Sequence, residues 1–269
     1  MLCRCTARRA ARDAVCGDWV QWGESERGDP VIFAREPRRN SLTRPDKRGQ
    51  PLTIAANIDR LLVVVAPSPD PNWEMVDRYL VAAEDLRAEA LILVNKHDLR
   101  DEAGWAGSEL GVYAGLGYGI VHVSAQTGYG WTDMNRTLRE GTSILVGQSG
   151  VGKSSLVRAL LPDLDIRIGA ISAATGRGRH TTTAATLYPL PCGGQLIDSP
   201  GVRDFALPPL EPGRIAQGFP ELRTHAARCR FPDCRHTVEP GCAVRKALER
   251  GEINERRYRS YRALVTTDA

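Results

Sequence analysis

Two short motifs occur along this 269-residue chain in the reverse of the order in which they are usually found together. The stretch ALILVNKHDL, residues 90–99, is an apolar strand that ends in the form N-K-x-D, which holds guanine in many nucleotide-binding proteins. A phosphate-binding loop, GQSGVGKS, follows only at residues 147–154, although it usually comes first. This order requires a sheet that has been cut and rejoined elsewhere, which is feasible because chain termini commonly lie close together.

The phosphate loop fits the pattern G-x-x-x-x-G-K-[ST], with an apolar strand, TSILV, before it and a helical stretch, SLVRALL, after it. Glycines let backbone N–H groups turn toward phosphate oxygens, and the helix N-terminus adds a favourable field. Lys153 adds a positive charge at the β- and γ-phosphates, and the Ser154 hydroxyl can ligate Mg²⁺. A chance glycine turn is disfavoured because strand, loop and helix all agree. The residues expected to bind the phosphates are Gly147, Gln148, Ser149, Gly150, Val151, Gly152, Lys153, Ser154 and Ser155.

The stretch Asn95-Lys96-His97-Asp98 is the candidate base-reading site. Asp98 can accept hydrogen bonds from two N–H groups of guanine, whereas adenine would leave its carboxylate without a partner, which is costly at a desolvated site. Asn95 can bond the far side of the ring, and the Lys96 stem can cover its face. N-K-x-D alone is a weak indication, but the strand IVHV ends in Ser124-Ala125, the usual form of a loop whose backbone amide meets the guanine O6.

Two further motifs complete a GTPase set. The strand QLI ends in Asp198-Ser-Pro-Gly201, the form D-x-x-G, whose Asp usually bonds a Mg²⁺ water and whose Gly amide meets the γ-phosphate. The stretch GRGRHTTT, residues 176–183, suits a switch loop in which one of three threonines, Thr182 in our assignment, reaches Mg²⁺ together with Ser154. All five elements are present in permuted order, and we expect GTP and GDP as ligands.

A cysteine–histidine cluster near the C-terminus predicts a metal site. Cys229, Cys234, His236 and Cys242 lie within fourteen residues, and three thiolates with one imidazole match a closed tetrahedral Zn²⁺ site of the structural kind. Unrelated reduced thiols are the alternative. The other cysteines, and His225, lie outside this spacing, and we expect Cys3, Cys5 and Cys16 to be ordinary strand residues.

The net charge of +4 is unevenly distributed. Residues 1–60 hold 12 Lys and Arg against 8 Asp and Glu, residues 61–220 hold 13 against 17, and residues 221–262 hold 11 against 6. Basic flanks around an acidic middle suggest flanks that contact a polyanion, although solvated surface charge explains the pattern equally well. Residues 243–264, AVRKALERGEINERRYRSYRAL, are predicted to be helical, with Arg and Tyr interleaved. This pattern suits contact with RNA phosphates and stacking on bases. The alternative is a helix that packs its apolar side chains and Tyr against the GTPase domain while its Arg side chains face water.

Amino-acid composition and hydrophobic pattern divide the chain into three parts. Residues 1–58 are rich in Arg and turn formers with short β-like pieces, residues 59–212 alternate apolar strands with helices, and residues 213–269 are dense in Cys, His and Arg. The alternation predicts an α/β domain with a mostly parallel sheet and helices on both faces. No apolar run is long enough to span a membrane and no secretory leader is evident, so we expect a cytoplasmic protein without a membrane partner.

The chain resembles the ribosome small subunit-dependent GTPase A family, which are circularly permuted bacterial GTPases. The residues that carry this resemblance are PRRNSLTRPD, AANIDRLLVVV, VNKHDL, VSAQTGYG, GQSGVGKSSL, TGRGRHTTT, DSPGVRDF and CRFPDCRH with EPGCAV. It implies a multi-domain α/β protein with an N-terminal OB-like β-barrel, a central permuted P-loop GTPase and a C-terminal helical zinc domain. It also implies Zn²⁺ and Mg²⁺ as cofactors, a monomer, and the small ribosomal subunit with its rRNA as partner. The family's OB-fold is usually longer at its N-terminus, so we expect a shortened barrel here.

The resemblance implies GTP hydrolysis stimulated by the small subunit during its late maturation. Ras-like GTPases place a Gln after D-x-x-G to orient water, but Val202 occupies that position and cannot do so. His180 in the switch stretch is our candidate for that role, with Lys153 at the phosphates; a His that contacts RNA or nothing is the alternative. Two other functions stay open: an RNA-binding assembly factor that uses GTP only as a conformational latch, and a metabolic P-loop NTPase, which the NKHD motif and the basic C-terminal part disfavour.

Overall fold

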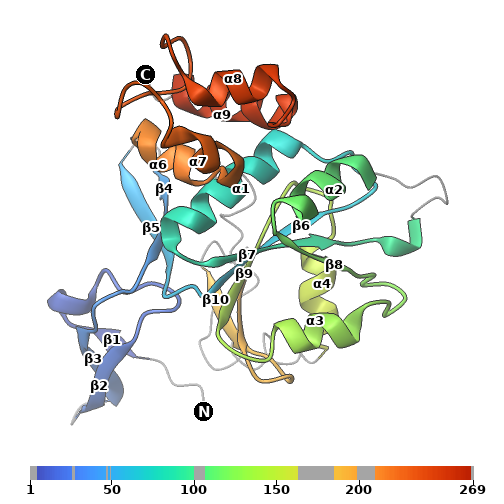
Figure 1. The fold of residues 1–269 in the computed structure, drawn as a ribbon. Coiled ribbons are helices and arrows are strands. Elements are labelled where there is room, and N and C mark those ends of the chain that lie inside the picture. Colours follow the sequence, from blue (N-terminus) through green and yellow to red (C-terminus); the bar gives the residue numbers. More distant parts are fainter. Residues whose placement is uncertain are drawn as a thin grey trace.

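A six-stranded sheet forms the centre of the molecule in this computed structural model, which describes residues 5–25, 28–46, 48, 50–99, 107–162, 185–198 and 210–267 (Figure 1). The strand order is β10-β11-β9-β6-β7-β8, and every neighbouring pair is parallel except β10 with β11. The strands are β6 (Arg60–Val65), β7 (Glu89–Val94), β8 (Gly119–His122), β9 (Thr142–Val146), β10 (Thr186–Pro189) and β11 (Gln195–Asp198). The mostly parallel sheet predicted from the sequence is confirmed.

The permutation is visible in the sheet because β6, the first of these strands along the chain, lies in the middle between β7 and β9. Five consecutive apolar residues of β6, Leu61–Val65, are buried, as expected of a strand covered on both faces. Because β6, β7, β8, β9 and β11 run parallel, the loops that follow them all leave from one edge of the sheet. The motifs that are far apart in the sequence are therefore brought to the same edge.

Helices cover both faces of the sheet (Figure 1). One core joins the sheet to α1 (Trp73–Leu86) and α2 (Gly107–Gly115), and the other joins it to α3 (Trp131–Thr137) and α4 (Lys153–Leu160). Asn72 caps α1, since its Oδ1 accepts from Met75 N at 3.0 Å. Helix α3 begins at Trp131, directly after the left-handed Gly130.

The N-terminal part is made of β-strands, as its composition suggests. One sheet has the order β1-β3-β2 and a second pairs β4 with β5. The elements are β1 (Thr6–Ala7), η1 (Arg9–Ala11), β2 (Val20–Ser25), β3 (Gly28–Arg35), β4 (Ser41–Pro45) and β5 (Pro51–Ala56). Asn40 ties this part to the central domain, because its Nδ2 donates to Ile58 O at 2.8 Å and to Leu86 O at 3.0 Å.

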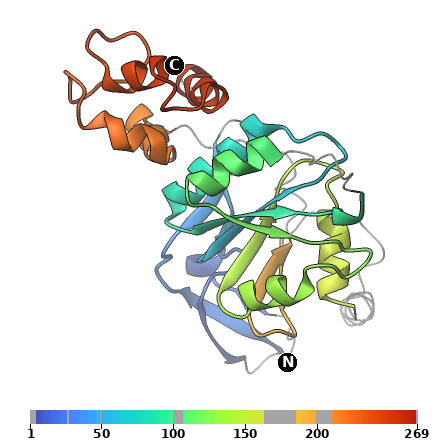
Figure 2. The ribbon, with the colours of Figure 1, turned by 45° about the vertical axis from the view of Figure 1, so that its right-hand side comes forward.

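The C-terminal part is helical and packs on α1 (Figures 1 and 2). Its helices are α6 (Pro212–Gln217), α7 (Pro220–Ala226), α8 (Ala243–Glu249) and α9 (Glu255–Thr267), and they share a core that includes Val81 of α1. The continuous helical reading of residues 243–264 is wrong in one respect. The left-handed Gly251 ends the first helix, and Asn254 Oδ1 accepts from Arg257 N at 3.1 Å as the next begins.

Candidate nucleotide site and metal centre

Asn95 joins three of the loops at the carboxyl edge of the sheet. It follows β7 and is buried, with 1% of its surface exposed. Its Nδ2 donates to Val151 O of the phosphate loop at 2.9 Å, and its Oδ1 accepts from Ala125 N at 3.3 Å. The N-K-x-D, S-A and phosphate motifs, which are up to 56 residues apart in the chain, therefore meet at one side chain.

Glycine is required where the two motifs are closest. Gly152 has φ +95°, and a Cβ atom there would lie 2.3 Å from Asn95 Nδ2. Both the backbone conformation and the close approach exclude a side chain. The last glycine of the phosphate loop thus makes room for the residue that holds the base-reading loop against it.

Lys96 extends the same contact to a loop that the sequence did not single out. Its Nζ donates to Gly150 O at 2.8 Å and to Ser68 O at 2.7 Å, and Asn72 N donates to Gln148 Oε1 at 3.1 Å. Residues 67–72, which follow β6, therefore pack against the outside of the phosphate loop. The sequence feature that could have indicated this contact is the turn-rich stretch PSPDPN, which follows a buried strand.

Asp98 lies in η2 (His97–Leu99) and is exposed, as a residue must be if it is to contact a base. Ser124 Oγ donates to Asp98 Oδ1, and Ser124 Oγ itself accepts from Thr127 N at 3.1 Å. The carboxylate is thus held by the loop whose amide at Ala125 we expect to meet the guanine O6. The two motifs therefore lie side by side at this edge of the sheet.

The phosphate loop has its lysine folded against it. Lys153 Nζ donates to Gly147 O at 2.5 Å and to Gln148 O at 2.7 Å, which places the ammonium group beside the loop backbone. Lys153 is also the first residue of α4, so the loop leads directly into the N-terminus of an eight-residue helix. Ser154 and Ser155 follow and are exposed at that end, and Ser149 lies at the tip of the loop.

The remaining predicted residues are divided by what the structure describes. Asp198 ends β11, which lies beside β9 and so reaches the same edge as the phosphate loop. The predicted switch stretch, residues 176–183 with His180 and Thr182, lies outside the described residues, as do Cys3, Gly201 and Val202.

The four predicted metal ligands come together in the C-terminal part. The ligand atoms of Cys229, Cys234, His236 and Cys242 all lie within 4.8 Å of one another. His236 Nδ1 lies 3.5 Å from Cys229 Sγ and 3.6 Å from Cys242 Sγ, and the two Sγ atoms are 4.0 Å apart. A tetrahedral Zn²⁺ requires about 3.6 Å between nitrogen and sulfur and about 3.8 Å between sulfurs, so the cluster could bind such an ion.

Without a metal ion, burial favours the neutral forms of these groups. Burial raises the pKa of Cys234 to about 12 and also raises the pKa of Cys242, so the isolated thiols would remain protonated at neutral pH. Burial lowers the pKa of His236, which keeps its imidazole neutral and able to act as a ligand. A divalent cation would reverse the preference of the thiols, because coordination deprotonates them.

Two further features shape the loop that carries the ligands. Burial opposes the charge of Glu239, but backbone N–H groups, among them those of Arg235 at 2.9 Å and Thr237 at 2.9 Å, outweigh it and lower its pKa to about 2. From α9, Tyr258 OH donates to His236 O at 2.6 Å and Tyr261 OH donates to Arg235 O at 2.7 Å. Both tyrosines are buried, so the expectation that they stack on RNA bases is wrong, and the packing alternative is correct for them.

Two consecutive arginines of α9 connect the C-terminal part to the central domain. Arg257 is fully buried; its NH1 donates to Asp77 Oδ1 at 2.6 Å, and its Nε and NH2 donate to both carboxylate oxygens of Glu221. Arg256 donates to Asp77 Oδ2 at 2.7 Å and to Glu109 Oε2 at 2.7 Å. These arginines pair with α1, α2 and α7, and Arg257 is fully buried while Arg256 is half-buried.

This fold and this set of loops define a circularly permuted P-loop GTPase. Comparisons with known proteins agree. A model of the RsgA GTPase family matches residues 35–208. The chain is 48% identical over 268 residues to the small ribosomal subunit biogenesis GTPase RsgA of Azotobacter vinelandii, covering 99% of this chain and 78% of the relative. It is 47% identical over 266 residues to the protein of that name from Pseudomonas aeruginosa, covering 98% of this chain and 78% of the relative.

Solved structures give the same answer. YjeQ from Thermotoga maritima superposes with a TM-score of 0.78 at 34% identity, covering 98% of this chain and 89% of that chain. YloQ, a circularly permuted GTPase, superposes with a TM-score of 0.74 at 26% identity, covering 98% and 85%. The chain belongs to the RsgA GTPase family, a family of enzymes that hydrolyse GTP.

Proposed function

We propose that the loops at the carboxyl edge of the sheet bind GTP, with Asp98, Ala125 and Lys153 in the roles expected from the sequence and Asn95 and Lys96 in a different one. Asp98 and Ala125 read the base, Asn95 and Lys96 hold the base-reading loop against the phosphate loop, and Lys153 contacts the phosphates. The observation that carries this proposal is the double contact of Asn95 with Val151 O and Ala125 N. Titration with GTP, GDP and ATP tests it, because capture of ATP as readily as GTP would contradict it.

We assign the metals by the chemistry of the side chains. Ser154 and Thr182 would hold Mg²⁺, an ion that neutralises charge developing on the β- and γ-phosphates when bound. Cys229, Cys234, His236 and Cys242 would hold one structural Zn²⁺, since four protein ligands leave no open position. Metal analysis of the purified protein tests the stoichiometry and the identity of the second ion.

We further propose that His180 positions the attacking water or accepts its proton, because Val202 cannot. Both residues lie outside the described residues, so this assignment depends on the sequence alone. Replacement His180→Ala should lower the turnover of GTP and leave its affinity unchanged. Full turnover in that variant would show that the role is wrong.

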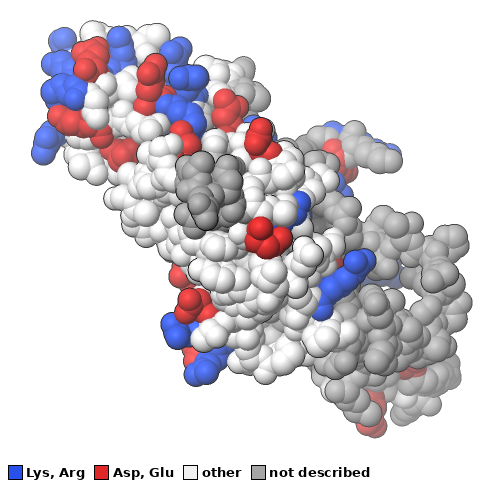
Figure 3. Space-filling model, turned by 90° about the vertical axis from the view of Figure 1, so that its right-hand side faces the viewer, with Lys and Arg blue, Asp and Glu red and all other residues white. Residues whose placement is uncertain are grey.

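We propose the small ribosomal subunit as the partner, because the relatives from Azotobacter vinelandii and Pseudomonas aeruginosa are small ribosomal subunit biogenesis GTPases. In Figure 3, Lys and Arg side chains gather, with acidic residues between them, on the upper lobe of this view. Exposed basic residues of the C-terminal part suit rRNA phosphates: Arg228, Arg230, Arg235, Lys246, Arg259 and Arg262. We retain the division at residues 1–58, 59–212 and 213–269, a monomer, and action in the cytoplasm where ribosomes mature.

Among the described residues, none of the helices has the length and apolar character needed to span a lipid bilayer.

The use of GTP purely as a latch is not favoured, because the family consists of GTPases. The experiment that separates the two is GTP hydrolysis measured alone, with small subunits and with large subunits as control. We expect stimulation by small subunits only, and none in Lys153→Ala. Equal rates in all three conditions would contradict the proposal.

A further inference from the structure

A stack of two aromatic rings joins the two loops of the base-reading site. The imidazole of His97, the variable residue of N-K-x-D, lies parallel to the ring of Tyr129 with centroids 4.0 Å apart and an angle of 13° between the planes. The same imidazole makes a T-shaped contact with the ring of His122, with centroids 5.8 Å apart. Tyr129 belongs to residues 123–130, the loop that also carries Ser124 and Ala125. The stack is therefore a contact between the loop of Asp98 and the loop of the O6-directed amide.

The position of Tyr129 is fixed by its backbone. It lies between Gly128 and Gly130, which have φ +82° and +75°, and a Cβ atom at Gly130 would lie 1.9 Å from His122 O. Ser124 N donates to Tyr129 O at 3.0 Å, which closes the turn on the motif itself. The sequence Gly-Tyr-Gly thus makes a tight turn that presents the tyrosine ring to His97.

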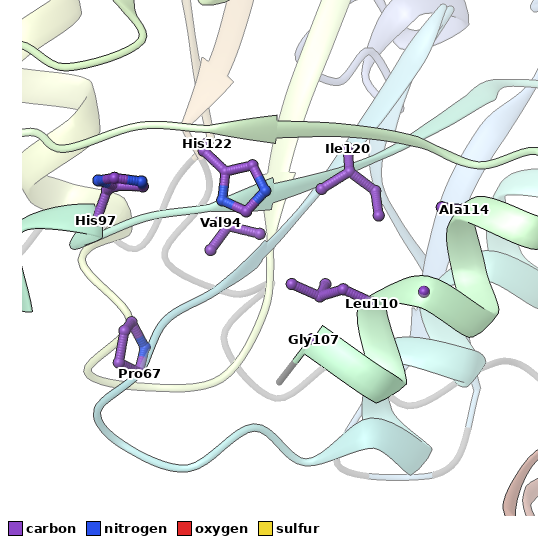
Figure 4. A pocket seen from close by; sticks show the side chains of 9 residues that line it. Pro67, Val94, His97, Gly107, Leu110, Ala114, Ile120 and His122 are labelled. Atoms are coloured by element: carbon purple, nitrogen blue, oxygen red, sulfur yellow. The ribbon is translucent and has the colours of Figure 1, made fainter. Parts of the chain in front are cut away.

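Hydrogen bonds also hold the loop of Asp98, among them the one that Ser124 Oγ donates to the Asp98 carboxylate. Asp98 is exposed, and its backbone is anchored through the neighbouring His97 N, which donates to Val123 O at 3.1 Å. His97 also lines a cavity of about 270 Å³, whose other walls include Val94, Leu110 and Ile120 (Figure 4). Among the described residues, the stack on Tyr129 is the closest ring contact of the imidazole.

We propose that His97 and Tyr129 are positioning residues for guanine recognition, whose stack fixes Asp98 against the 2-amino edge of the base. This inference rests on the proposed GTP-binding function. The carboxylate must aim both oxygens at two N–H groups of guanine, so a small rotation of residues 97–98 would weaken that pair of bonds. The stack of His97 on Tyr129 resists such a rotation.

The test compares Tyr129→Ala with Tyr129→Phe, which keeps the ring. Affinities for GTP and for inosine triphosphate, which lacks the 2-amino group, are measured by titration. We expect Tyr129→Ala to weaken GTP binding by roughly 2- to 10-fold, the range typical of one aromatic pair. The affinity for inosine triphosphate should fall less than the affinity for GTP, so the preference for GTP over inosine triphosphate should decrease. Tyr129→Phe should retain the wild-type preference. Tyr129 is 52% exposed, so these variants leave the core intact.

Further variants complete the experiment. Leu99→Ala truncates another exposed side chain of the same loop and should change neither affinity. The double variant His97→Ala with Tyr129→Ala should be no weaker than either single variant, because both remove one contact. Equal weakening of both nucleotides, or an unchanged preference in Tyr129→Ala, would overturn the inference and leave the base site standing. A wild-type protein that does not prefer GTP over ATP would instead refute the proposed function itself.

Discussion

Asp98 is the single residue on which the choice of base depends in the proposed site. Asp98→Asn replaces one acceptor oxygen by a donor, which suits xanthine, whose C2 carries an oxygen where guanine carries an amino group. We expect the variant to prefer XTP to GTP, and competition binding with both nucleotides measures this. The physical reason is that the mismatched pair leaves polar groups without partners at the ligand. A variant that still selects GTP would refute the assignment of Asp98.

Gly152 offers a second test at the residue scale, because its requirement is steric. A Cβ atom in Gly152→Ala would be forced against Asn95 Nδ2 in a left-handed backbone conformation. The strain is about 1–2 kcal/mol, so we expect GTP affinity to fall at least about 5-fold. The matched control is Gly111→Ala on α2, where an added Cβ meets no atom within 4 Å. That variant should keep GTP affinity and gain up to about 1 kcal/mol in free energy of unfolding. Equal affinities in the two variants would contradict the steric argument.

At the scale of elements, α9 connects two parts of the molecule. Its arginines Arg256 and Arg257 pair with α1, α2 and α7, while Tyr258 and Tyr261 donate to the backbone that carries the metal ligands. Arg256 also reaches Glu109 at the start of α2, the helix that follows the N-K-x-D loop in the chain. The helix therefore contacts both the metal centre and the helices that support the base-reading loop.

Loss of one buried arginine should be costly. Arg257→Met leaves Glu221 without its bidentate partner and removes one of the cations from Asp77, which is fully buried. Breaking a buried ion pair by removing one partner costs about 3–5 kcal/mol, and urea unfolding measures this loss. The control is Arg259→Met, an exposed residue of the same helix, which should change the free energy of unfolding by no more than about 0.5 kcal/mol. Similar losses in both variants would show that the network does not stabilise the fold.

The sequence predicted most strands and helices but not their long-range partners. Apolar runs such as residues 61–65 identify buried strands by local pattern alone. The sequence left two roles open for the Arg–Tyr stretch in α9, contact with RNA or packing within the protein. It could not decide between them for the arginines, because their acidic partners, such as Asp77, lie far away in the chain. The break at Gly251 could have been predicted, because a glycine within a helical pattern often ends a helix. The sequence analysis instead continued the helix through this residue.

At the scale of the whole molecule, motif order was enough to predict that distant loops share one site. Chemistry constrains those residue types tightly, since guanine and phosphate each demand specific donors and acceptors. The loop of residues 67–72 was not predicted, because it contacts the phosphate loop mainly through backbone atoms and any side chains could accompany them. Tyr129 was missed for a similar reason: its partner His97 is the variable residue of its motif.

The cysteine–histidine cluster and the proposed nucleotide site lie in different cores, so they should respond separately to metal removal. The cluster packs with α6–α9, whereas the nucleotide loops are supported by the two cores of the central sheet. A chelator should therefore raise hydrogen exchange across residues 229–242 and α8, while GTP affinity in the presence of Mg²⁺ changes little.

Cys234→Ser should have the same effect and abolish the bound zinc, because a structural zinc supplies folding free energy to its ligands' segment. Cys192→Ser, a cysteine outside the cluster, is the matched control and should keep one equivalent of metal. Retained zinc in Cys234→Ser would refute the ligand assignment. Loss of GTP binding together with the metal would instead mean that α9, through Arg256 and Arg257, transmits the state of the metal centre to the base-reading loop.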